Sequence, residues 1–171
     1  MEFDILYFIN GMHFPLLDWI MVFITHLGSK GIFWIILSAV LMIFPETRKC
    51  GITVMAALLL SLLFGNILLK NIVQRMRPCW IDSGIRLLVS MPEDYSFPSG
   101  HTFASFAAAA GIFMYYRRAG MAAMALAALI GFSRLYLFVH FPSDVLAGAV
   151  LGVLSGILAY ALTQKLYKNL R

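Results

Sequence analysis

Long apolar runs with almost no charged side chains are the feature of this sequence that most restricts its fold. The five runs cover residues 31–44, 50–69, 99–116, 121–139 and 145–164. About 20 apolar residues in a helix span the hydrocarbon core of a bilayer, and most of these runs are close to that length. Within lipid every backbone N–H and C=O group needs a partner in the chain, which a helix provides. We therefore predict an all-α, polytopic membrane helical bundle with about five transmembrane helices.

Composition excludes a soluble protein of this size. Of the 171 residues, 61% are hydrophobic and only 12% are charged, whereas soluble domains average about 25% charged residues. The formal net charge of +5 does not predict a nucleic-acid partner, because the basic residues separate the apolar runs instead of forming one stripe. We interpret residues 1–171 as a single membrane-embedded domain, and the sequence leaves its oligomeric state open.

The N-terminal region is apolar but is interrupted by polar side chains and by Pro15. A clean membrane span tolerates few such residues. We expect two short amphipathic helices, near residues 3–10 and 16–27, that lie in or dip into the interface. Residues 1–28 would then be an interfacial region ahead of a catalytic core at residues 29–171. The alternative is a single kinked span with its kink at Pro15.

Clusters of basic residues follow three of the five runs. They lie at residues 48–49, 117–118 and 165–171. If the five helices alternate in direction, the clusters share one side of the membrane, which the positive-inside rule assigns to the cytoplasm together with the C-terminus. The opposite, extracytoplasmic side then receives residues 70–98, His101 and residues 134–144. The polar motifs described next all lie on that outer side.

Lys70 and Arg77 lie seven residues apart at the outer end of the second run. Seven residues are two helical turns with an offset of only about 20°, so in a continuing helix both cations point the same way. Basic residues are uncommon on the outer side, so this pair favours an anion site there. Snorkelling at the membrane border is the alternative, and Arg75 between them could be a plain interfacial charge.

The segment Pro98-Ser99-Gly100-His101 opens the third run. Pro98 and Gly100 favour a tight turn, and the residues from Ser99 onward are typical of a helix. The first N–H groups of a helix have no internal partner and attract anions, above all phosphate. His101 on that first turn could pass a proton to a bound anion. A helix that begins with Ser-Gly near an uninvolved histidine is the alternative.

Arg134, His140 and Asp144 form a third polar group between the last two runs. An arginine near the end of a membrane helix is costly unless it faces a cavity or a partner. Pro142 predicts the start of the last helix, with Asp144 on its first turn. The carboxylate could then orient the ring of His140 through one nitrogen and leave the other as nucleophile or base. An N-capping aspartate beside an interfacial histidine is the alternative.

Three segments of the chain form one ordered pattern: Lys70-x6-Arg77-Pro78, Pro98-Ser99-Gly100-His101 and Ser133-Arg134-x5-His140-x3-Asp144. This pattern resembles the three-part signature of the type 2 phosphatidic acid phosphatase family, which shares its site with vanadium haloperoxidases and bacterial class A acid phosphatases. Each motif is weak alone, but three in order are highly specific. The resemblance covers about the last two thirds of the chain and implies a lipid phosphatase that works through a phosphohistidine intermediate.

The resemblance also implies a role for each site residue. His140 would attack phosphorus, Asp144 would orient it, and His101 would protonate the leaving group and then activate water. The phosphate oxygens would be held by Lys70, Arg77, Ser99, Gly100 and Arg134. No Asp/Glu cluster suited to Mg²⁺ and no Cys/His zinc spacing lies near these segments, so we expect metal-independent hydrolysis without a cofactor.

The resemblance departs from the family in the number of spans. Many bacterial membrane members of the family have six spans, one of which precedes the segment that corresponds to residues 14–29 here. We therefore expect five full spans and an interfacial N-terminal region in this chain.

A site at the outer membrane border suits a phosphate carried on a lipid. We expect residues 79–97 to cover the head group, with Trp80 and Tyr95 at the interface. Because small bacterial family members often recycle it, we favour undecaprenyl pyrophosphate at the outer leaflet of a bacterial plasma membrane. Phosphatidylglycerophosphate, phosphatidic acid and lipid A phosphates are alternative substrates. A haloperoxidase and a non-catalytic lipid-binding or flipping protein are alternatives of other classes.

Overall fold

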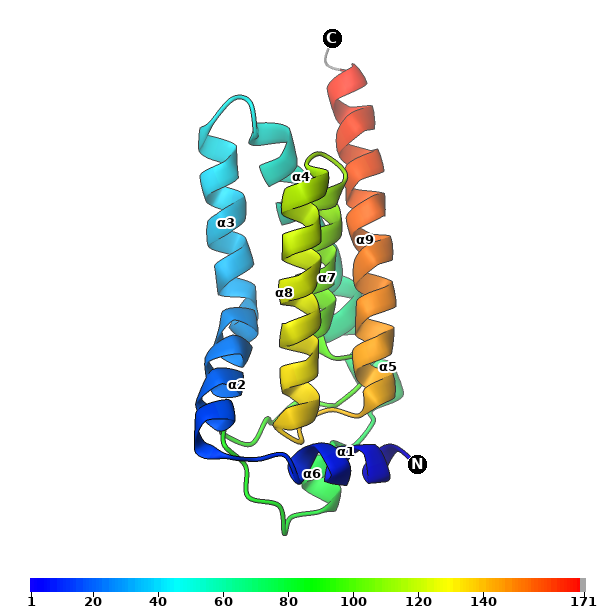
Figure 1. Cartoon of the computed structure of the whole chain (residues 1–171). Helices are drawn as coiled ribbons and strands as arrows, with labels where there is room; N and C mark the ends of the chain where they lie inside the picture. Colours follow the sequence, from blue (N-terminus) through cyan, green and yellow to red (C-terminus); the bar gives the residue numbers. More distant parts are fainter. Residues whose placement is uncertain (170–171) are drawn as a thin grey trace.

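The computed structural model describes residues 1–169, and in that part of the chain the protein forms helices and loops without a β-strand (Figure 1). The helices are α1 (Glu2–Asn10), α2 (Pro15–Gly28), α3 (Ile32–Ile43), α4 (Arg48–Ser61), α5 (Lys70–Val73), α6 (Pro78–Ile81), α7 (Gly100–Phe113), α8 (Arg117–Tyr136) and α9 (Pro142–Asn169). A short 3₁₀ turn at Ser29–Gly31 joins α2 to α3, and a stretch of π-helix at Leu62–Leu69 joins α4 to α5. The predicted all-α class is confirmed.

Four helical segments are long and apolar enough to cross a membrane. They run from Pro15 to Ile43, from Arg48 to Ile81, from Arg117 to Tyr136 and from Pro142 to Asn169. Helix α7, with 14 residues, is the fifth helix of the bundle and packs against α4, α8 and α9 (Figure 1). The bundle therefore agrees with the prediction of about five membrane helices.

Small residues allow α9 to pack closely against α7. Gly148, Gly152 and Gly156 share one face of α9, and a Cβ atom on Gly152 would lie 2.6 Å from the backbone oxygen of Phe103. A Cβ atom on Gly156 would lie 2.7 Å from the backbone oxygen of Ala107. Membrane helices associate largely through such close packing, because the lipid around them is as apolar as their side chains. This contact fixes the first turn of α7 beside the first turn of α9.

The N-terminal region differs from the prediction in its second helix. Helix α1 lies across one end of the bundle, which we call the outer end, as expected for an interfacial helix (Figure 1). In contrast, α2 runs along the bundle and continues into α3 as one bent segment. Pro15 fits the first turn of α2 without bending it. The bend lies instead at Lys30 (φ 51°) and Gly31 (φ 67°), both in the left-handed region.

Internal partners explain why α2 can leave the interface. Asp18 accepts a hydrogen bond of 2.5 Å from the hydroxyl of Tyr136 and lies 3.0 Å from Nδ1 of His13. Thr25 accepts a hydrogen bond of 2.5 Å from the guanidinium of Arg134. His13 and Asp18 are therefore paired with groups of the bundle, whereas His26 on α2 stays exposed. The structure replaces the predicted second interfacial helix with the outer half of a bent candidate span.

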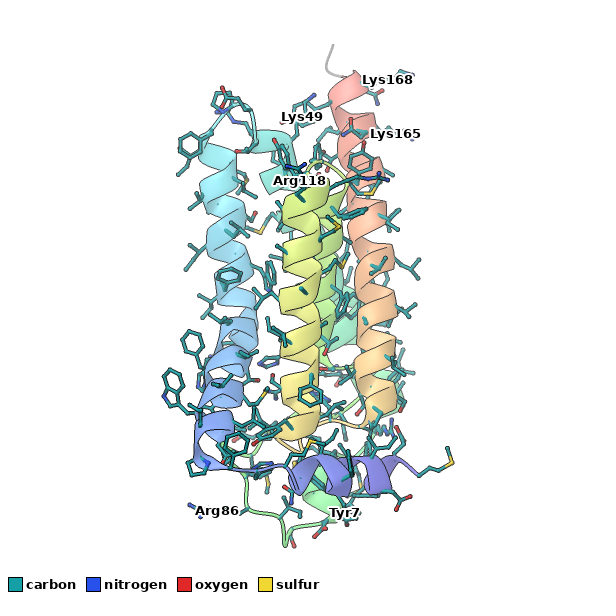
Figure 2. All side chains as sticks on the ribbon, in the orientation of Figure 1. Tyr7, Lys49, Arg86, Arg118, Lys165 and Lys168 are labelled. Carbon is teal, nitrogen blue, oxygen red and sulfur yellow. The ribbon has the colours of Figure 1, made fainter. Side chains whose placement is uncertain are left out.

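Basic side chains gather at the end of the bundle opposite α1. Lys49, Arg118, Lys165 and Lys168 all lie there (Figure 2). The polar motifs lie at the outer end, so the two groups are separated as the sequence predicts. Which side of a membrane each end faces stays a prediction.

Candidate active site

The three motifs meet at the outer end of the bundle. Lys70 begins α5, His101 lies in the first turn of α7, and His140 lies in the turn between α8 and α9. The backbone N–H of Ser99 donates to the backbone carbonyl of Asp144 over 3.1 Å, which ties the start of α7 to the start of α9. The site therefore combines helix ends and loops that are far apart in the sequence.

His140 is buried, with only 1% of its surface exposed, and both of its ring nitrogens have partners. Its Nε2 atom lies 3.0 Å from Nη1 of Arg77. Because a guanidinium can only donate, Nε2 is the unprotonated nitrogen in this arrangement, and its electron pair accepts the hydrogen bond from Arg77. The Nδ1–H group then donates to the Ser96 hydroxyl over 3.3 Å. The ring thus presents a nucleophilic nitrogen to the cationic side of the site.

Asp144 orients His140 mainly through Ser96. Oδ2 of Asp144 lies 3.7 Å from Nδ1 of His140, which is beyond a direct hydrogen bond. The Ser96 hydroxyl donates to the same Oδ2 atom over 2.5 Å, and the backbone N–H of Phe141 donates to it over 2.8 Å. The predicted histidine and aspartate are together, but a serine links them. Sequence reasoning missed Ser96 because it lies in an irregular loop, where no periodic pattern marks a residue.

The surroundings of His140 favour its neutral form. Burial, followed by the charges of Arg77, Arg134 and Lys70, holds the pKa of His140 well below its ordinary value of 6.5. The ring is therefore neutral at neutral pH. A neutral imidazole is the form that can attack phosphorus.

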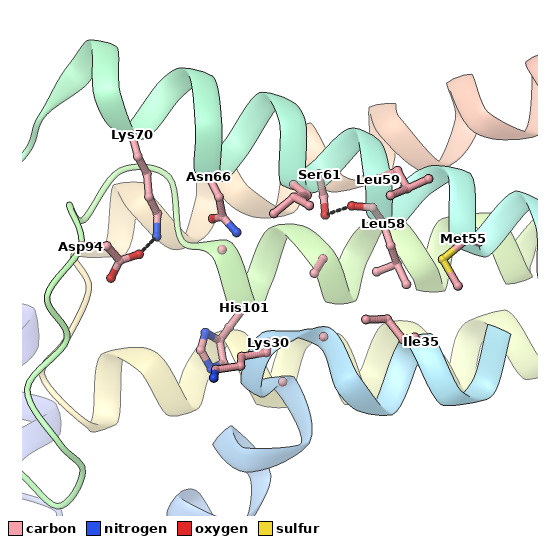
Figure 3. A pocket seen from close by; sticks show the side chains of 15 residues that line it. Lys30, Ile35, Met55, Leu58, Leu59, Ser61, Asn66, Lys70, Asp94 and His101 are labelled. Atoms are coloured by element: carbon pink, nitrogen blue, oxygen red, sulfur yellow. Dashed lines mark hydrogen bonds and ion pairs between the residues drawn. The ribbon is translucent and has the colours of Figure 1, made fainter. Parts of the chain in front are cut away.

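Arg77 and Lys70 are both buried and both bind Asp94. Arg77 donates over 2.7 Å from Nη2 to Oδ1 of Asp94, and over 2.7 Å from Nε to its backbone oxygen. Lys70 makes an ion pair with the other carboxylate oxygen of Asp94 (Figure 3). Burial alone would raise the pKa of Asp94, but the hydrogen bond and charge of Lys70, together with Arg77, hold it at about 2. The ionised carboxylate of Asp94 is therefore bound to Lys70 and Arg77, the two cations that we predicted to bind phosphate.

Arg134 and Ser99 are in the site with part of their hydrogen-bonding capacity in use. Arg134 donates to Thr25, but within the described residues its buried Nε atom has no partner, which leaves a donor for a ligand oxygen. The Ser99 hydroxyl lies 2.9 Å from the hydroxyl of Thr102. Ser99 can donate to a phosphate oxygen only while Thr102 is the donor in that pair.

A cavity of about 390 Å³ opens beside His101 (Figure 3). Its polar lining residues are Lys30, Ser61, Asn66, Lys70, Asp94 and His101, and its apolar lining residues include Ile35, Met55, Leu58, Leu59 and Leu62. The polar groups other than Ser61 lie at one end, near the start of α7, and the apolar side chains extend away from it between α3 and α4 (Figure 3). Gly100 also lines the cavity, and a Cβ atom there would lie 2.7 Å from Oδ1 of Asn66. His101 therefore faces a space suited to a polar head and an apolar chain.

Arg75 is more than an interfacial charge. Its Nη1 atom donates to Oδ1 of Asp144 over 2.7 Å, and its Nη2 atom donates to Glu2 over 2.5 Å. Its guanidinium carbon also lies 4.1 Å from the ring centre of Phe141. The chain leaves the helix at Gln74 (φ 49°), so helical spacing could not predict the direction of Arg75.

Comparisons with known proteins agree with this architecture. The PAP2 superfamily model matches residues 51–168. The undecaprenyl-diphosphatase of Sulfolobus acidocaldarius is 33% identical over 145 residues, which cover 84% of this chain and 69% of that protein. The crystal structure of Aquifex aeolicus LpxE matches with a TM-score of 0.81 and 29% identity, covering 92% of this chain and 93% of that one. A transmembrane PAP2-type phosphatidylglycerolphosphate phosphatase from Bacillus subtilis matches with a TM-score of 0.77 and 27% identity, covering 95% and 84%.

Proposed function

The chain belongs to the PAP2 superfamily. On that premise we propose that it removes the terminal phosphate of a polyprenyl diphosphate, and that its substrate is undecaprenyl diphosphate. The position of Arg77 carries the proposal, because one guanidinium contacts both Nε2 of His140 and the carboxylate of Asp94. A phosphate that replaced the carboxylate on Arg77 and Lys70 would lie next to the nucleophilic nitrogen.

The proposed reaction has two steps. First, Nε2 of His140 forms a bond to the terminal phosphorus while the bond from phosphorus to the bridging oxygen breaks. His101 gives that oxygen a proton, and the lipid monophosphate leaves. His101 then accepts a proton from water, whose oxygen attacks the phosphohistidine and releases inorganic phosphate and neutral His140. Lys70, Arg77 and Arg134 neutralise charge on the phosphate oxygens in both steps.

We further propose that no metal ion takes part. Phosphoryl transfer needs mainly positioning and charge stabilisation, which Mg²⁺ supplies in many enzymes. The buried cations Lys70, Arg77 and Arg134 can supply that charge here. Turnover in excess EDTA should equal turnover without it, and a complete loss that Mg²⁺ restores would contradict the proposal.

Lys30 supports a diphosphate substrate over a monophosphate. It lies in the bend of the Pro15–Ile43 segment and lines the cavity that His101 faces (Figure 3). A charge this far from the ends of an apolar span is costly unless it serves a partner or a ligand. Within the described residues Lys30 has no ion pair, so its charge is available. A cation on the side of His101 would stabilise the lipid-linked phosphate as it leaves.

A phospholipid monoester is the alternative substrate. Similarity to the phosphatidylglycerolphosphate phosphatase structure favours it, and the apolar end of the cavity suits an acyl chain as well as a polyprenyl chain. Phosphatidic acid and lipid A phosphates fall within the same alternative.

Phosphate release by the detergent-purified protein would test these assignments on undecaprenyl diphosphate, undecaprenyl monophosphate, phosphatidylglycerophosphate, phosphatidic acid and lipid A. We expect the diphosphate to be hydrolysed fastest. His140→Ala and His101→Ala should each lower kcat by about 100-fold or more. His26→Ala, an exposed histidine on α2, is the matched control and should behave like wild type. Two active-site variants with normal turnover would disprove the mechanism, and an inert wild type would favour a lipid-binding or flipping protein.

A further inference from the structure

Helix α1 contributes to the charge network around the catalytic carboxylate. We propose that Arg75 is a positioning residue for Asp144 and that Glu2 of α1 holds Arg75 in place, so that catalysis depends on the docking of α1. The inference rests on the proposed function, because it assumes that Asp144 keeps His140 oriented during phosphate transfer. Glu2 lies outside the three motifs, and Arg75 is one of the unspecified positions between Lys70 and Arg77.

Arg75 is the partner of the carboxylate oxygen that faces away from His140. Oδ2 of Asp144 already accepts hydrogen bonds from Ser96 and Phe141, whereas Oδ1 accepts one from Arg75 over 2.7 Å. Asp144 is fully buried, and the Arg75 side chain is 27% exposed. A buried carboxylate that loses its cation becomes an uncompensated charge, and the structure around it has to rearrange. Without Arg75, Asp144 would therefore hold Ser96 and the His140 ring less firmly.

Glu2 fixes Arg75 and the start of α9 at once. Its Oε2 atom accepts a hydrogen bond of 2.5 Å from Arg75, and its Oε1 atom accepts from the backbone N–H and hydroxyl of Ser143 over 3.0 and 2.7 Å. Burial alone would raise the pKa of Glu2, but hydrogen bonds from Ser143 and Arg75 lower it, so it stays ionised. Ser143 lies in the first turn of α9, where N–H groups have no internal partner and attract a carboxylate. Glu2 therefore links α1 to the turn that carries the catalytic groups.

Apolar contacts hold α1 in this position. Leu6 is fully buried, and the ring of Phe3 lies edge-on to Phe141 with 5.3 Å between centroids. Ile5 and Phe8 are exposed, at 46% and 69% of their surface, as expected for a helix with one side toward the interface. A single helix thus contacts both the membrane border and the network around Asp144.

The test compares variants of the full-length protein on undecaprenyl diphosphate in detergent. Arg75→Gln should lower kcat by about 10- to 100-fold while KM stays within about threefold, because Arg75 acts through Asp144 and does not bind substrate. Arg75→Lys keeps the charge and should recover part of the loss. Glu2→Gln keeps an oxygen that can accept from Ser143 and loses only the carboxylate that faces Arg75. It should cause a smaller loss, and adding it to Arg75→Gln should cause no further loss. Tyr7→Phe is the control on α1: it removes the hydrogen bond from Tyr7 to Asp82 and should turn over like wild type.

Each contrary result has a distinct meaning. Normal kcat in Arg75→Gln, or a rise in KM as large as the fall in kcat, would overturn the positioning role. Additive losses in the double variant would overturn the role of Glu2. Thermal unfolding of each variant shows whether the fold itself is lost.

A second readout does not depend on turnover. The ¹⁵N signals of His140 should show the Nδ1–H tautomer in wild type and a mixture of tautomers in Arg75→Gln. An unchanged tautomer would overturn the inference even if the wild type released no phosphate from any lipid. A wild type without activity would instead count against the proposed function.

Discussion

The carboxylate of Asp94 forms ion pairs with Lys70 and Arg77, so an incoming phosphate has to compete with it for these two cations. Asp94→Asn removes that negative charge and should strengthen the binding of inorganic phosphate or vanadate. The gain should be at most about fivefold, because exposed ion pairs are screened by water and the Asp94 side chain is 56% exposed. The inhibition constants of phosphate and vanadate, compared between Asp94→Asn and wild type, measure this gain in affinity. Asp82→Asn is a control in the same loop region, and weaker anion binding in Asp94→Asn would show that Asp94 orients the cations instead of competing.

His140 should titrate at lower pH than a free imidazole. Its pKa is held well below 6.5 by burial and by three nearby cations, so at about pH 6, where most free imidazole is protonated, the folded ring should still be neutral. Because the unfolded chain binds a proton at this position more readily, the contribution of His140 to stability should fall as the pH drops below 6.5. The ¹⁵N signal that disappears in His140→Gln identifies the ring. An imidazolium signal at that pH would contradict the expectation.

At the scale of helices, the bend between α2 and α3 brings the backbone against His101. A Cβ atom on Gly28 would lie 2.9 Å from Cδ2 of His101, and Lys30 follows two residues later. Lys30→Gln should lower kcat/KM for a polyprenyl diphosphate by about tenfold, because one charge on the leaving phosphate loses its partner. Turnover of a monophosphate should change by less than about twofold in the same variant.

Two further variants separate charge from backbone conformation in this bend. Lys30→Arg keeps the charge and should retain the preference for diphosphate. Lys30→Gly removes the charge but suits the left-handed backbone (φ 51°), so it should lose activity as Lys30→Gln does without losing thermal stability. Equal losses on both substrates would show that Lys30 shapes the bend and does not select the substrate.

Helix ends could be predicted from the sequence, but the paths of loops could not. His101 and Asp144 lie on the first turns of helices, where turn and capping residues predict direction. The helix of Lys70 instead ends at Val73, so helical spacing did not predict how Lys70 and Arg77 come together. Ser96 and Asp94 lie in the irregular stretch before α7, and their positions depend on contacts with distant helices. The tertiary partners of α2 likewise outweighed its polar sequence pattern. Loop residues around a predicted site therefore need a structure before roles can be assigned.

At the scale of the whole molecule, the predicted basic clusters lie at one end of the bundle and the active site lies at the other. The basic clusters in the described chain gather opposite α1 (Figure 2), and basic residues are retained on the cytoplasmic side of membrane proteins. We therefore propose that the site opens on the extracytoplasmic face of a bacterial plasma membrane and that the C-terminus is cytoplasmic. A diphosphate head group in the outer leaflet would then reach His101 while its chain stayed in the bilayer.

Cysteine labelling on intact cells tests this orientation. Cys50 and Cys79 are free but buried, so the unmodified chain should label weakly. Glu93→Cys at the outer end and Lys168→Cys at the opposite end each place a thiol at an exposed position. A membrane-impermeant maleimide should label Glu93→Cys on intact cells, and Lys168→Cys only after permeabilisation. The reverse pattern would place the site in the cytoplasm, where the enzyme could act only on lipids of the inner leaflet, and the proposal of an outer-leaflet diphosphate would have to be abandoned even if the purified protein hydrolysed that lipid.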